Sequence, residues 1–244
     1  MENIVIGRNP VLEAIKSGRT IEKIIIKKGR YEGSMVPVIK KAKEAHIIIQ
    51  EVDRAKLDVM SHGQNHQGVI ALVSSFTYCG VKDILEAAAT KEESPFVIIC
   101  DKITDPHNFG AIIRTAECVG VHGIIIPKRG SVGVNATVEK TSAGAAEYMK
   151  IAKVTNIAST IDELKKEGMW FVAADMDGEE MYNVDLKGSL GIVIGSEGEG
   201  VSRLVKEKCD FIASIPMMGT INSLNASVAG GILMYEALRQ RRTK

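Results

Sequence analysis

The sequence has no long hydrophobic run and no apolar leader. None of its segments reaches the stretch of about 18 consecutive apolar residues that a membrane-spanning helix needs. The first ten residues, MENIVIGRNP, carry an acidic residue at position 2 and lack the apolar core of a signal peptide. These absences exclude a membrane anchor and favour a cytoplasmic protein.

The sequence also lacks paired cysteines. Its four cysteines are Cys79, Cys100, Cys118 and Cys209. No two of them form a C-x-x-C pair, so neither a disulfide framework nor a zinc site is expected, and we interpret them as reduced, buried thiols. A chain of 244 residues with 45% hydrophobic content buries roughly 70% of its unfolded surface, so one or two domains can fold without disulfides or a structural metal.

A strong charge of one sign is missing as well. The chain has 31 Lys and Arg against 30 Asp and Glu, a net charge of +1. This net charge does not by itself indicate a nucleic-acid-binding protein. The distribution is uneven, since residues 1–76 carry 12 basic and 8 acidic residues and the remainder carries 19 and 22. A basic front part is compatible with phosphate binding, and equally with chance.

Apolar, β-branched runs alternate with segments of helical periodicity. The expected strands are 21–28, 46–52, 67–74, 95–103, 123–127, 170–176 and 190–195, and the expected helices between them include 36–45, 111–120 and 157–168. This alternation predicts an α/β protein whose parallel sheets are covered by helices on both faces. A polar segment within 76–94 is the expected domain boundary.

The first group of candidate residues lies in DKITDPHNFGAIIRTAECVGVHGIIIP, residues 101–127. A strand ends at Asp101, Asp105-Pro106 predicts a turn, and Asn108 stands where an N-cap would precede the helix that carries Arg114. Asn108 and Arg114 could both serve a site at the edge of the sheet. The alternative is that Asn108 only caps the helix and that Arg114 forms a surface ion pair.

The second group lies in IVIGSEGEGVSR, residues 192–203, where a buried strand runs into a glycine-rich loop. The glycines do not fit G-x-G-x-x-G and no G-K-[ST] follows, so a dinucleotide or P-loop phosphate site is excluded. Glu197 and Glu199 would suit a positively charged ligand or ribose hydroxyls. A turn with solvated acidic side chains is the alternative.

The third group follows the expected strand FIASIP, 211–216. After the loop 217–225 comes a helix over 226–242, and Ser223 and Asn225 lie at its entry, where side-chain oxygens cap free N–H groups. The first residues of this helix, ASVAGG, have such small side chains that one face of the helix, which we call its bare side, is almost without side-chain atoms. Each glycine there lowers the helix propensity by about 1 kcal/mol. We therefore expect another segment to pass unusually close to its first two turns.

Together these motifs resemble a known family. D-P-x-N-x-G-x-x-x-R at 105–114, I-G-S-E-G-E-G-V at 194–201 and S-I-P-M…S-L-N-x-S-V-A at 214–229 are similar to the three ordered motifs of the SpoU/TrmH family, which belongs to the SPOUT class of S-adenosylmethionine-dependent RNA ribose 2′-O-methyltransferases. GRNPVLEAI at 7–15 and HQGVIALV at 66–73 resemble the amino-terminal domain of the branch that methylates a guanosine of 23S ribosomal RNA.

The resemblance implies a domain plan and a fold that composition does not reveal. It implies an L30e-like α/β RNA-binding domain over 1–76, a linker over 77–94, and a parallel-sheet SPOUT methyltransferase domain with a deep trefoil knot over 95–244. The knot would explain the bare side of the last helix, because backbone would have to pass against backbone there. The resemblance also implies a homodimer formed through the knotted domain.

The resemblance further assigns roles to residues. Arg114 would be the catalytic residue, and Asn108, Glu197, Ser223 and Asn225 would orient it, the ribose and the cofactor. Gly195, Ile215 and Leu224 would bind S-adenosylmethionine. The partner would be 23S ribosomal RNA, not DNA or a membrane, and no metal would be needed. A guanidinium is a poor base, so Arg114 more readily stabilises the developing negative charge on the 2′-oxygen.

Several alternatives stay open at this point. The substrate could be tRNA or a ribosomal RNA adenosine linked to antibiotic resistance, or the chain could be a non-catalytic RNA-binding assembly factor. In the amino-terminal part, His62 and His66 have the spacing of helical metal ligands, but the neighbouring glycines favour a loop. Gly7, Arg8 and Asn9, which precede a helix expected to start near Pro10, could present N–H groups to phosphate or could simply cap the helix.

Overall fold

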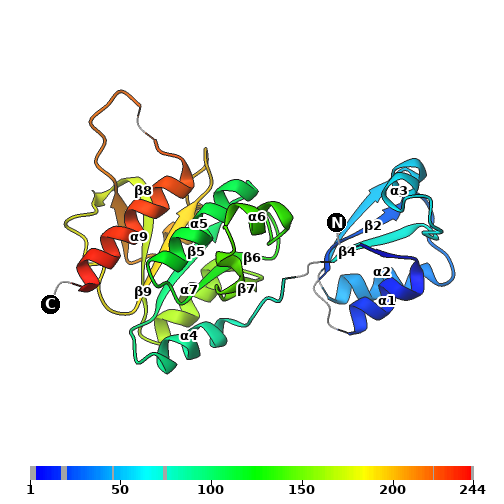
Figure 1. Cartoon of the computed structure of the whole chain (residues 1–244), viewed down its shortest axis with the longest axis horizontal. Helices are drawn as coiled ribbons and strands as arrows, with labels where there is room; N and C mark the ends of the chain where they lie inside the picture. The colour runs from blue at the N-terminus through cyan, green and yellow to red at the C-terminus, as the bar shows by residue number, and fades with distance from the viewer. Residues whose placement is uncertain (1–3, 18–20, 46, 74–75, 222, 243–244) are drawn as a thin grey trace. The chain divides into compact units, whose positions relative to one another are not determined.

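The computed structural model describes residues 4–17, 21–45, 47–73, 76–221 and 223–242. The chain divides into two compact units, Met1–Thr77 and Tyr78–Lys244, each with its own sheet (Figure 1). This division lies at the beginning of the segment 76–94, where the sequence predicts a domain boundary.

The amino-terminal unit is a four-stranded sheet with helices on both faces. Its elements are β1 (Ile4–Ile6), α1 (Arg8–Lys16), β2 (Ile21–Lys27), α2 (Met35–Glu44), β3 (Ile48–Val52), α3 (Arg54–Met60) and β4 (Val69–Val73). The strand order is β1-β4-β2-β3. Helices α1 and α2 pack on one face through Val11, Val38 and Ala42, and Leu57 of α3 packs on the other.

The prediction of parallel sheets is wrong for this unit. Only β2 and β3 are parallel, whereas β4 runs antiparallel to both β1 and β2. Strand β1 has three residues, too few to show an alternation of apolar and polar residues in the sequence, so it was not predicted. The segment with His62 and His66 is a loop, as predicted. His66 is buried and uses both ring nitrogens, toward the Asp58 carboxylate at 2.9 Å and the Gly68 N–H at 2.9 Å, while His62 is exposed.

The second unit is a six-stranded, fully parallel sheet, as the sequence predicts. Its elements are α4 (Val81–Thr90), β5 (Phe96–Asp101), α5 (Pro106–Cys118), β6 (Gly123–Pro127), α6 (Ala136–Thr141), the 3₁₀ turn η1 (Ala145–Glu147), β7 (Ile151–Val154), α7 (Ile157–Lys166), β8 (Trp170–Glu180), β9 (Leu190–Gly195), α8 (Arg203–Lys206), β10 (Phe211–Ser214) and α9 (Ala226–Arg242). The order is β10-β8-β9-β5-β6-β7, and every neighbouring pair is parallel.

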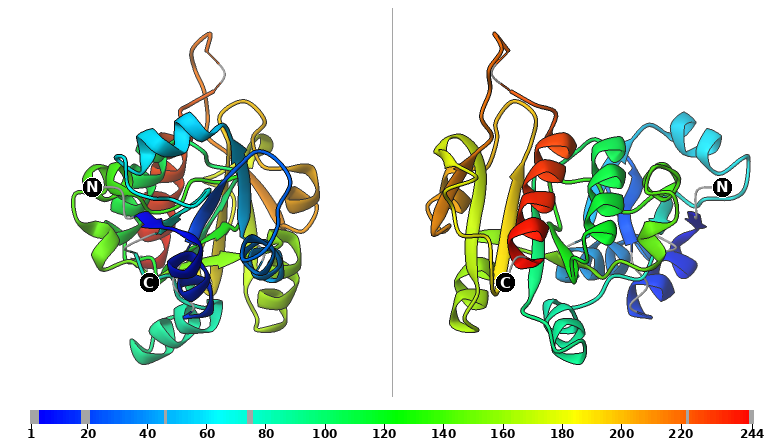
Figure 2. Two further views of the ribbon diagram at one scale, coloured as in Figure 1. Left: turned by 90° about the vertical axis from the view of Figure 1, so that its right-hand side faces the viewer. Right: turned by 60° about the vertical axis from the view of Figure 1, so that its left-hand side comes forward.

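Helices cover both faces of this sheet. On one face, α4 and α7 bury Ile84, Ile161 and Leu164 against strand residues such as Ile99. On the other face, α5 and α9 lie side by side, with α9 also against β9 (Figures 1 and 2). Strands buried on both sides explain the continuous apolar runs by which they were identified in the sequence.

Most of the predicted linker 77–94 belongs to this second unit. Helix α4 occupies residues 81–90, and its Ile84 is fully buried. The Ile84 side chain fills the space that a Cβ atom would occupy at Gly123 on β6. The linker prediction is therefore wrong over this segment. The polar end of the segment, TKEES, made the whole segment resemble a linker, although the helix before it has an apolar face.

The burial of the cysteines differs from the expectation. All four cysteines are free. The expectation of buried thiols is confirmed for Cys100 alone, because Cys79 and Cys209 are half-buried and Cys118 is exposed at the end of α5. Within the described residues, no helix has the length and apolar character that crossing a membrane requires.

The small residues of α9 do allow a close approach, but of a different kind from the one expected. A Cβ atom at Gly230 would overlap the Ile194 side chain of β9, not backbone, and at Gly231 the space is open to ordinary contact with Thr115. Backbone approaches backbone at Gly195 instead, where a Cβ atom would overlap the main chain of Gly200 and Val201.

Candidate functional site

The centre of the second sheet is a topological switch point. The chain runs outward from β5 through β6 to β7 and then crosses over to form β8, β9 and β10 on the other side of β5. In open parallel sheets, ligands bind in the crevice outside the carboxyl ends of the strands at such a point. Here the crevice lies between the ends of β5 and β9, at Asp101 and Gly195, which are register partners.

Helix α5 starts directly at this crevice. Its N-cap is Asp105, whose carboxylate accepts a hydrogen bond from the His107 N–H at 3.0 Å, and Pro106 occupies the first helical position. The prediction of Asn108 as the N-cap is therefore wrong. Asp followed by Pro is the stronger start signal, because proline favours an extended residue before it and has a φ suited to the first turn. Asn108 lies inside the first turn with its side chain free for other contacts.

The loop after β9 is held tightly at the edge of the sheet. Ser196 and Gly200 pair through two backbone hydrogen bonds of 3.2 and 3.0 Å, N–H to carbonyl oxygen in each direction. The buried carboxylate of Asp101 accepts a hydrogen bond from the Ser202 N–H at 2.8 Å, which ties this loop to the end of β5. The turn between these two anchors presents the exposed Glu197.

The start of α9 completes the site. The side-chain oxygen of Asn225 accepts hydrogen bonds from the N–H groups of Ser227 at 2.9 Å and Val228 at 3.3 Å, so Asn225 caps the helix as predicted. Its side-chain nitrogen donates to Asn108 Oδ1 at 2.8 Å and to Glu197 Oε1. Asn108 Nδ2 donates to the same Glu197 oxygen at 2.9 Å.

These three residues, Asn108, Glu197 and Asn225, form what we call the Asn–Glu cluster. It joins α5, the loop after β9 and α9 at the switch point. Because Glu197 Oε1 accepts from both asparagines, the amide orientations are fixed, and Asn108, which is 7% exposed, has a partner for both its amide nitrogen and its oxygen.

The remaining predicted site residues lie outside this hydrogen-bonded cluster. Arg114 is exposed on α5, six residues after Asn108, and forms no ion pair with any residue that the structure describes. Gly195 ends β9 beside the cluster. Ile215, Ser223 and Leu224 belong to the loop that connects β10 to α9, where Ile215 is half-buried and the other two are exposed.

Sequence reasoning missed two residues that shape the crevice. Asp101 was noted only as the end of a strand, yet it anchors the loop after β9. Lys102, with a positive φ of 58°, places its ammonium 3.3 Å from the Glu199 carboxylate. A charged pair directly after a buried strand was the available signal, since such residues lie at the carboxyl edge of a parallel sheet.

An apolar groove of about 520 Å³ runs between α5 and α9, next to Arg114 along α5. Its lining residues are Ala111, Thr115, Ser227, Val228, Gly231, Ile232 and Tyr235. Val228 and Tyr235 are large apolar residues that are about half exposed there, at 49% and 54%.

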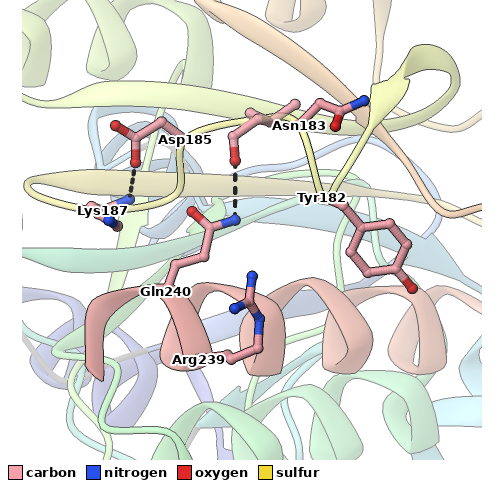
Figure 3. A pocket seen from close by; sticks show the side chains of 7 residues that line it. Tyr182, Asn183, Asp185, Lys187, Arg239 and Gln240 are labelled. Atoms are coloured by element: carbon pink, nitrogen blue, oxygen red, sulfur yellow. Dashed lines mark hydrogen bonds between the residues drawn. The ribbon is translucent and has the colours of Figure 1, made fainter. Parts of the chain in front are cut away.

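A second hollow, of about 290 Å³, lies at the far end of α9, where side chains of the helix hold the segment 184–186 in place (Figure 3). The buried Gln240 accepts a hydrogen bond from the Leu186 N–H at 2.9 Å and donates to the carbonyl oxygen of Val184 at 3.1 Å and to Glu236 at 2.8 Å. Arg239 pairs with the same Glu236 and holds the pKa of that carboxyl below its usual value. Gln240 is about 22 Å of helical rise from Asn225, so this hollow is separate from the crevice.

The chemistry available at the crevice is polar and non-nucleophilic. Cys100, the thiol next to Asp101, is fully buried, and burial raises its pKa to about 12, so it stays protonated. Among the residues that the structure describes, no three His, Cys, Asp or Glu side chains gather in a way that would hold a metal ion. Amide groups, a carboxylate and an unpaired guanidinium suit the binding and orientation of a polar ligand.

Comparisons with known proteins assign both units. Residues 95–235 match the model of the SpoU rRNA methylase family, and residues 4–79 match a model described as RNA 2′-O ribose methyltransferase substrate binding. The two matches fall on the two structural units.

Relatives match over nearly the whole length. YacO of Bacillus subtilis, assigned to the TrmH family of tRNA/rRNA methyltransferases, is 50% identical over 238 residues, which are 97% of this chain and 95% of YacO. A Staphylococcus haemolyticus protein with the same family assignment is 48% identical over 244 residues, 99% of this chain and 97% of its own.

Solved structures share the fold. The SpoU methyltransferase AviRb from Streptomyces viridochromogenes, solved with AdoMet, superposes with a TM-score of 0.63 at 22% identity, over 100% of this chain and 92% of AviRb. The TrmH/SpoU tRNA modifying enzyme of A. aeolicus is 33% identical with a TM-score of 0.56, over 61% of this chain and 76% of that one.

Proposed function

Because the chain belongs to the SpoU rRNA methylase family, whose members are also known as the SpoU/TrmH RNA methyltransferases, we propose that it methylates the ribose 2′-oxygen of a guanosine in 23S ribosomal RNA. S-adenosylmethionine is the cofactor of this reaction. Two features support a large structured RNA as the substrate: the additional amino-terminal unit with its substrate-binding match, and the resemblance of residues 7–15 and 66–73 to the 23S guanosine branch.

The Asn–Glu cluster is the observation that carries this proposal. It brings residues from three separate motifs to the switch-point crevice, and it does so at the start of the helix that bears Arg114. Fixed amide groups and an exposed cation without an ion pair fit a reaction in which positioning and electrostatics do most of the work.

The loop between β10 and α9 fits the cofactor. Among the described residues, positions 215–221 and 223–224 form no hydrogen bond, so their main-chain N–H and C=O groups are available to a nucleoside-like ligand. Ile215 and Leu224 add apolar surface to the two ends of this loop, and Gly195 brings the backbone of residues 200 and 201 close to the end of β9. We propose that these residues hold the cofactor, with the Glu197 carboxylate favouring a positively charged sulfonium.

When bound, S-adenosylmethionine supplies a methyl group activated by its sulfonium. The protein's part is to hold the ribose and to stabilise charge. We propose that Arg114 donates hydrogen bonds to the 2′-oxygen as that atom gives up its proton to a solvent water molecule and becomes negative. An arginine guanidinium remains protonated in proteins, so electrostatic stabilisation suits it better than proton abstraction. The cluster keeps α5, and with it Arg114, in a fixed position relative to α9, and Ser223 lies on the adjacent loop to orient the ribose.

The groove between α5 and α9 supports a homodimer as part of the same proposal. A second copy would cover its apolar lining, including Tyr235 and Val228, and this surface adjoins the helix that bears Arg114. The family resemblance likewise supports a trefoil knot within residues 95–244, an L30e-like assignment of the amino-terminal unit, and a cytoplasmic location. Sedimentation of the wild type and of Tyr235→Glu tests the dimer, which the variant should weaken.

Methyl transfer to unmodified 23S ribosomal RNA tests the main proposal. The purified chain is incubated with S-adenosylmethionine and the RNA, which is then digested and searched for 2′-O-methylguanosine by mass spectrometry. We expect this nucleoside with the wild type and its loss with Arg114→Ala. Arg203→Ala is the matched control, since Arg203 is an exposed arginine on α8. Methylation of tRNA or of an adenosine instead would refute the substrate, and RNA binding without methyl transfer to any RNA would point to an assembly factor.

A further inference from the structure

The carboxyl edge of the six-stranded sheet has an uneven distribution of charge. On the β8 and β9 side, the segments 175–180 and 196–202 contain acidic residues and no lysine or arginine; the acids are Asp175, Asp177, Glu179, Glu180, Glu197 and Glu199. Lys206 pairs with Asp175 and Lys102 with Glu199, and the other four form no ion pair with a described residue. On the β6 side, the segment 128–135, which we call the basic loop, contains Lys128 and Arg129 and no acidic residue.

The basic loop is firmly attached to the segment that leads to the site. Ser131 Oγ and the Val132 N–H both donate to the carbonyl oxygen of Ile103, each at 2.8 Å. Ile103 lies between the end of β5 and the N-cap of α5, five residues before Asn108. At the two ends of the loop, the Lys128 N–H donates to Val154 O and the Val134 N–H donates to the Tyr78 hydroxyl, both at 2.8 Å.

The two cations of this loop are available to a ligand. Lys128 and Arg129 are exposed, and neither forms an ion pair with a residue that the structure describes. Other charges on this side of the edge are Lys102 and Asp105 on the β5–α5 segment, Glu139 and Lys140 on α6, and Lys153 near the end of β7, whose ammonium lies over the Tyr78 ring beside Gly133 of the loop. The Asp105 carboxylate is engaged as the cap of α5, so the basic loop remains the most positive part of this edge.

We propose that the basic loop binds the phosphate backbone of the RNA on one side of the target ribose, with Lys128 and Arg129 each contacting a phosphate. This inference rests on the proposed function for the identity of the reacting ribose. A polyanion entering the crevice is repelled by the acidic β8–β9 side and attracted to the β6 side. The strand therefore crosses the edge over β5 and β6, and the acidic side remains for a ligand that carries positive charge.

The salt dependence of RNA binding tests the proposal. A protein–phosphate contact contributes about 0.7 for single strands, and about 0.9 for duplexes, to the slope of log K against log salt concentration. Removal of two contacts in Lys128→Ala/Arg129→Ala should therefore reduce the slope by about 1.4–1.8. Between 50 and 200 mM salt, the Kd of the full-length wild type for a 23S ribosomal RNA transcript should then rise about 7- to 12-fold more than that of the variant.

Two control variants are matched to this change. Lys166→Ala removes an exposed lysine in the last turn of α7, which ends at the opposite edge of the sheet, and should leave the slope unchanged. Glu179→Gln/Glu180→Gln removes two charges on the acidic side and should not weaken RNA binding. Calorimetric binding of S-adenosylmethionine should be the same for the double variant as for the wild type, because the basic loop takes no part in that site.

The outcomes separate this inference from the proposed function. If Lys128→Ala/Arg129→Ala keeps the wild-type slope, or if Lys166→Ala reduces the slope by as much per charge removed, the basic loop does not bind the RNA backbone, even where methyl transfer proceeds. If the wild type binds RNA with the expected slope difference but transfers no methyl group, the proposed function fails and the binding surface stands. A wild type that binds no RNA would overturn both.

Discussion

The side chain of Asn225 has two separable tasks, and substitutions can remove one without the other. Its oxygen caps α9 through the N–H groups of Ser227 and Val228, and its nitrogen donates to Asn108 and Glu197. Asn225→Ser keeps a capping hydroxyl and removes the nitrogen donor, because serine caps helices about as well as asparagine. Asn225→Ala removes both.

The magnitudes follow from the two sets of hydrogen bonds. Loss of an N-cap costs about 1 kcal/mol, and loss of a partly exposed hydrogen bond costs about 0.5–1.5 kcal/mol. We expect Asn225→Ser to lower the free energy of unfolding by about 1 kcal/mol and Asn225→Ala by about 2 kcal/mol. Methyl transfer should fall by a similar factor in both, about 10- to 100-fold, since a displacement of about 1 Å near reacting groups has an effect of this size.

Urea unfolding and the rate of methyl transfer at saturating RNA are the two measurements. Asn156 supplies the control, because its side chain caps α7 in the same way, accepting from the Ser159 N–H at 3.1 Å, but it lies outside the cluster. Asn156→Ala should lose about 1 kcal/mol of stability and no activity. The reasoning is refuted if Asn225→Ser transfers methyl groups at the wild-type rate, or if Asn156→Ala loses as much activity as Asn225→Ala.

Three further predictions concern packing and pH. Gly195→Ala, whose Cβ would overlap backbone, should destabilise the chain by about 2–3 kcal/mol or more in urea; a change below 0.5 kcal/mol would contradict the geometry. Gly230→Ala should cost about 1–3 kcal/mol, and the double variant with Ile194→Val should be more stable than Gly230→Ala alone, because valine lacks the atom that the new methyl meets. Burial lowers the pKa of His122, against the raising effect of Glu93. The free energy of unfolding should therefore decline as pH falls below about 6.5, where the unfolded chain takes up a proton first, by at most about 1.4 kcal/mol per pH unit. His122→Gln should remove this part of the decline, and an unchanged pH profile would contradict it.

The strands of the second unit were predictable because they are buried on both faces. The expected ranges 123–127 and 190–195 coincide with β6 and β9, and the helix 226–242 coincides with α9. Such segments are long, uniformly apolar or clearly periodic. The elements that were missed, such as β1 with three residues and β7 with four, are too short to establish a period.

The errors concern competing local signals. Asn108 and Asp105 are both residue types that cap helices well, and only the effect of Pro106 on the residue before it indicates that the chain uses Asp105. In the amino-terminal unit, β4 pairs antiparallel because the loop 61–68 leads the chain back in the opposite direction. The pattern of apolar residues does not indicate in which direction a loop leads the chain. The membership of residues 78–94 in the second unit was not predicted, because α4 buries only one face, through Ile84 and Ala88.

The residues of the Asn–Glu cluster could be identified from the motifs, but their contacts could not. Asn108 is 89 residues from Glu197 and 117 from Asn225 along the chain, so no local pattern specifies which side chains meet. Taken one motif at a time, the amides and the carboxylate suggest caps or solvated groups, and only the family resemblance assigns them to a common site. Their convergence on a single Glu197 oxygen depends on the order of strands in the sheet.

The position of α9 links packing to the proposed chemistry. Because Gly230 has no Cβ, the helix can approach Ile194 on β9, and this approach sets how far the N-cap Asn225, about one and a half turns earlier, reaches across the crevice. Only then can Asn225 meet Asn108, whose helix also carries Arg114. The same carboxyl-terminal helix must therefore dock before the site exists, so the bare side of α9 is needed for the geometry of the crevice as well as for stability. A substitution that displaces α9 should reduce methyl transfer before it unfolds the chain.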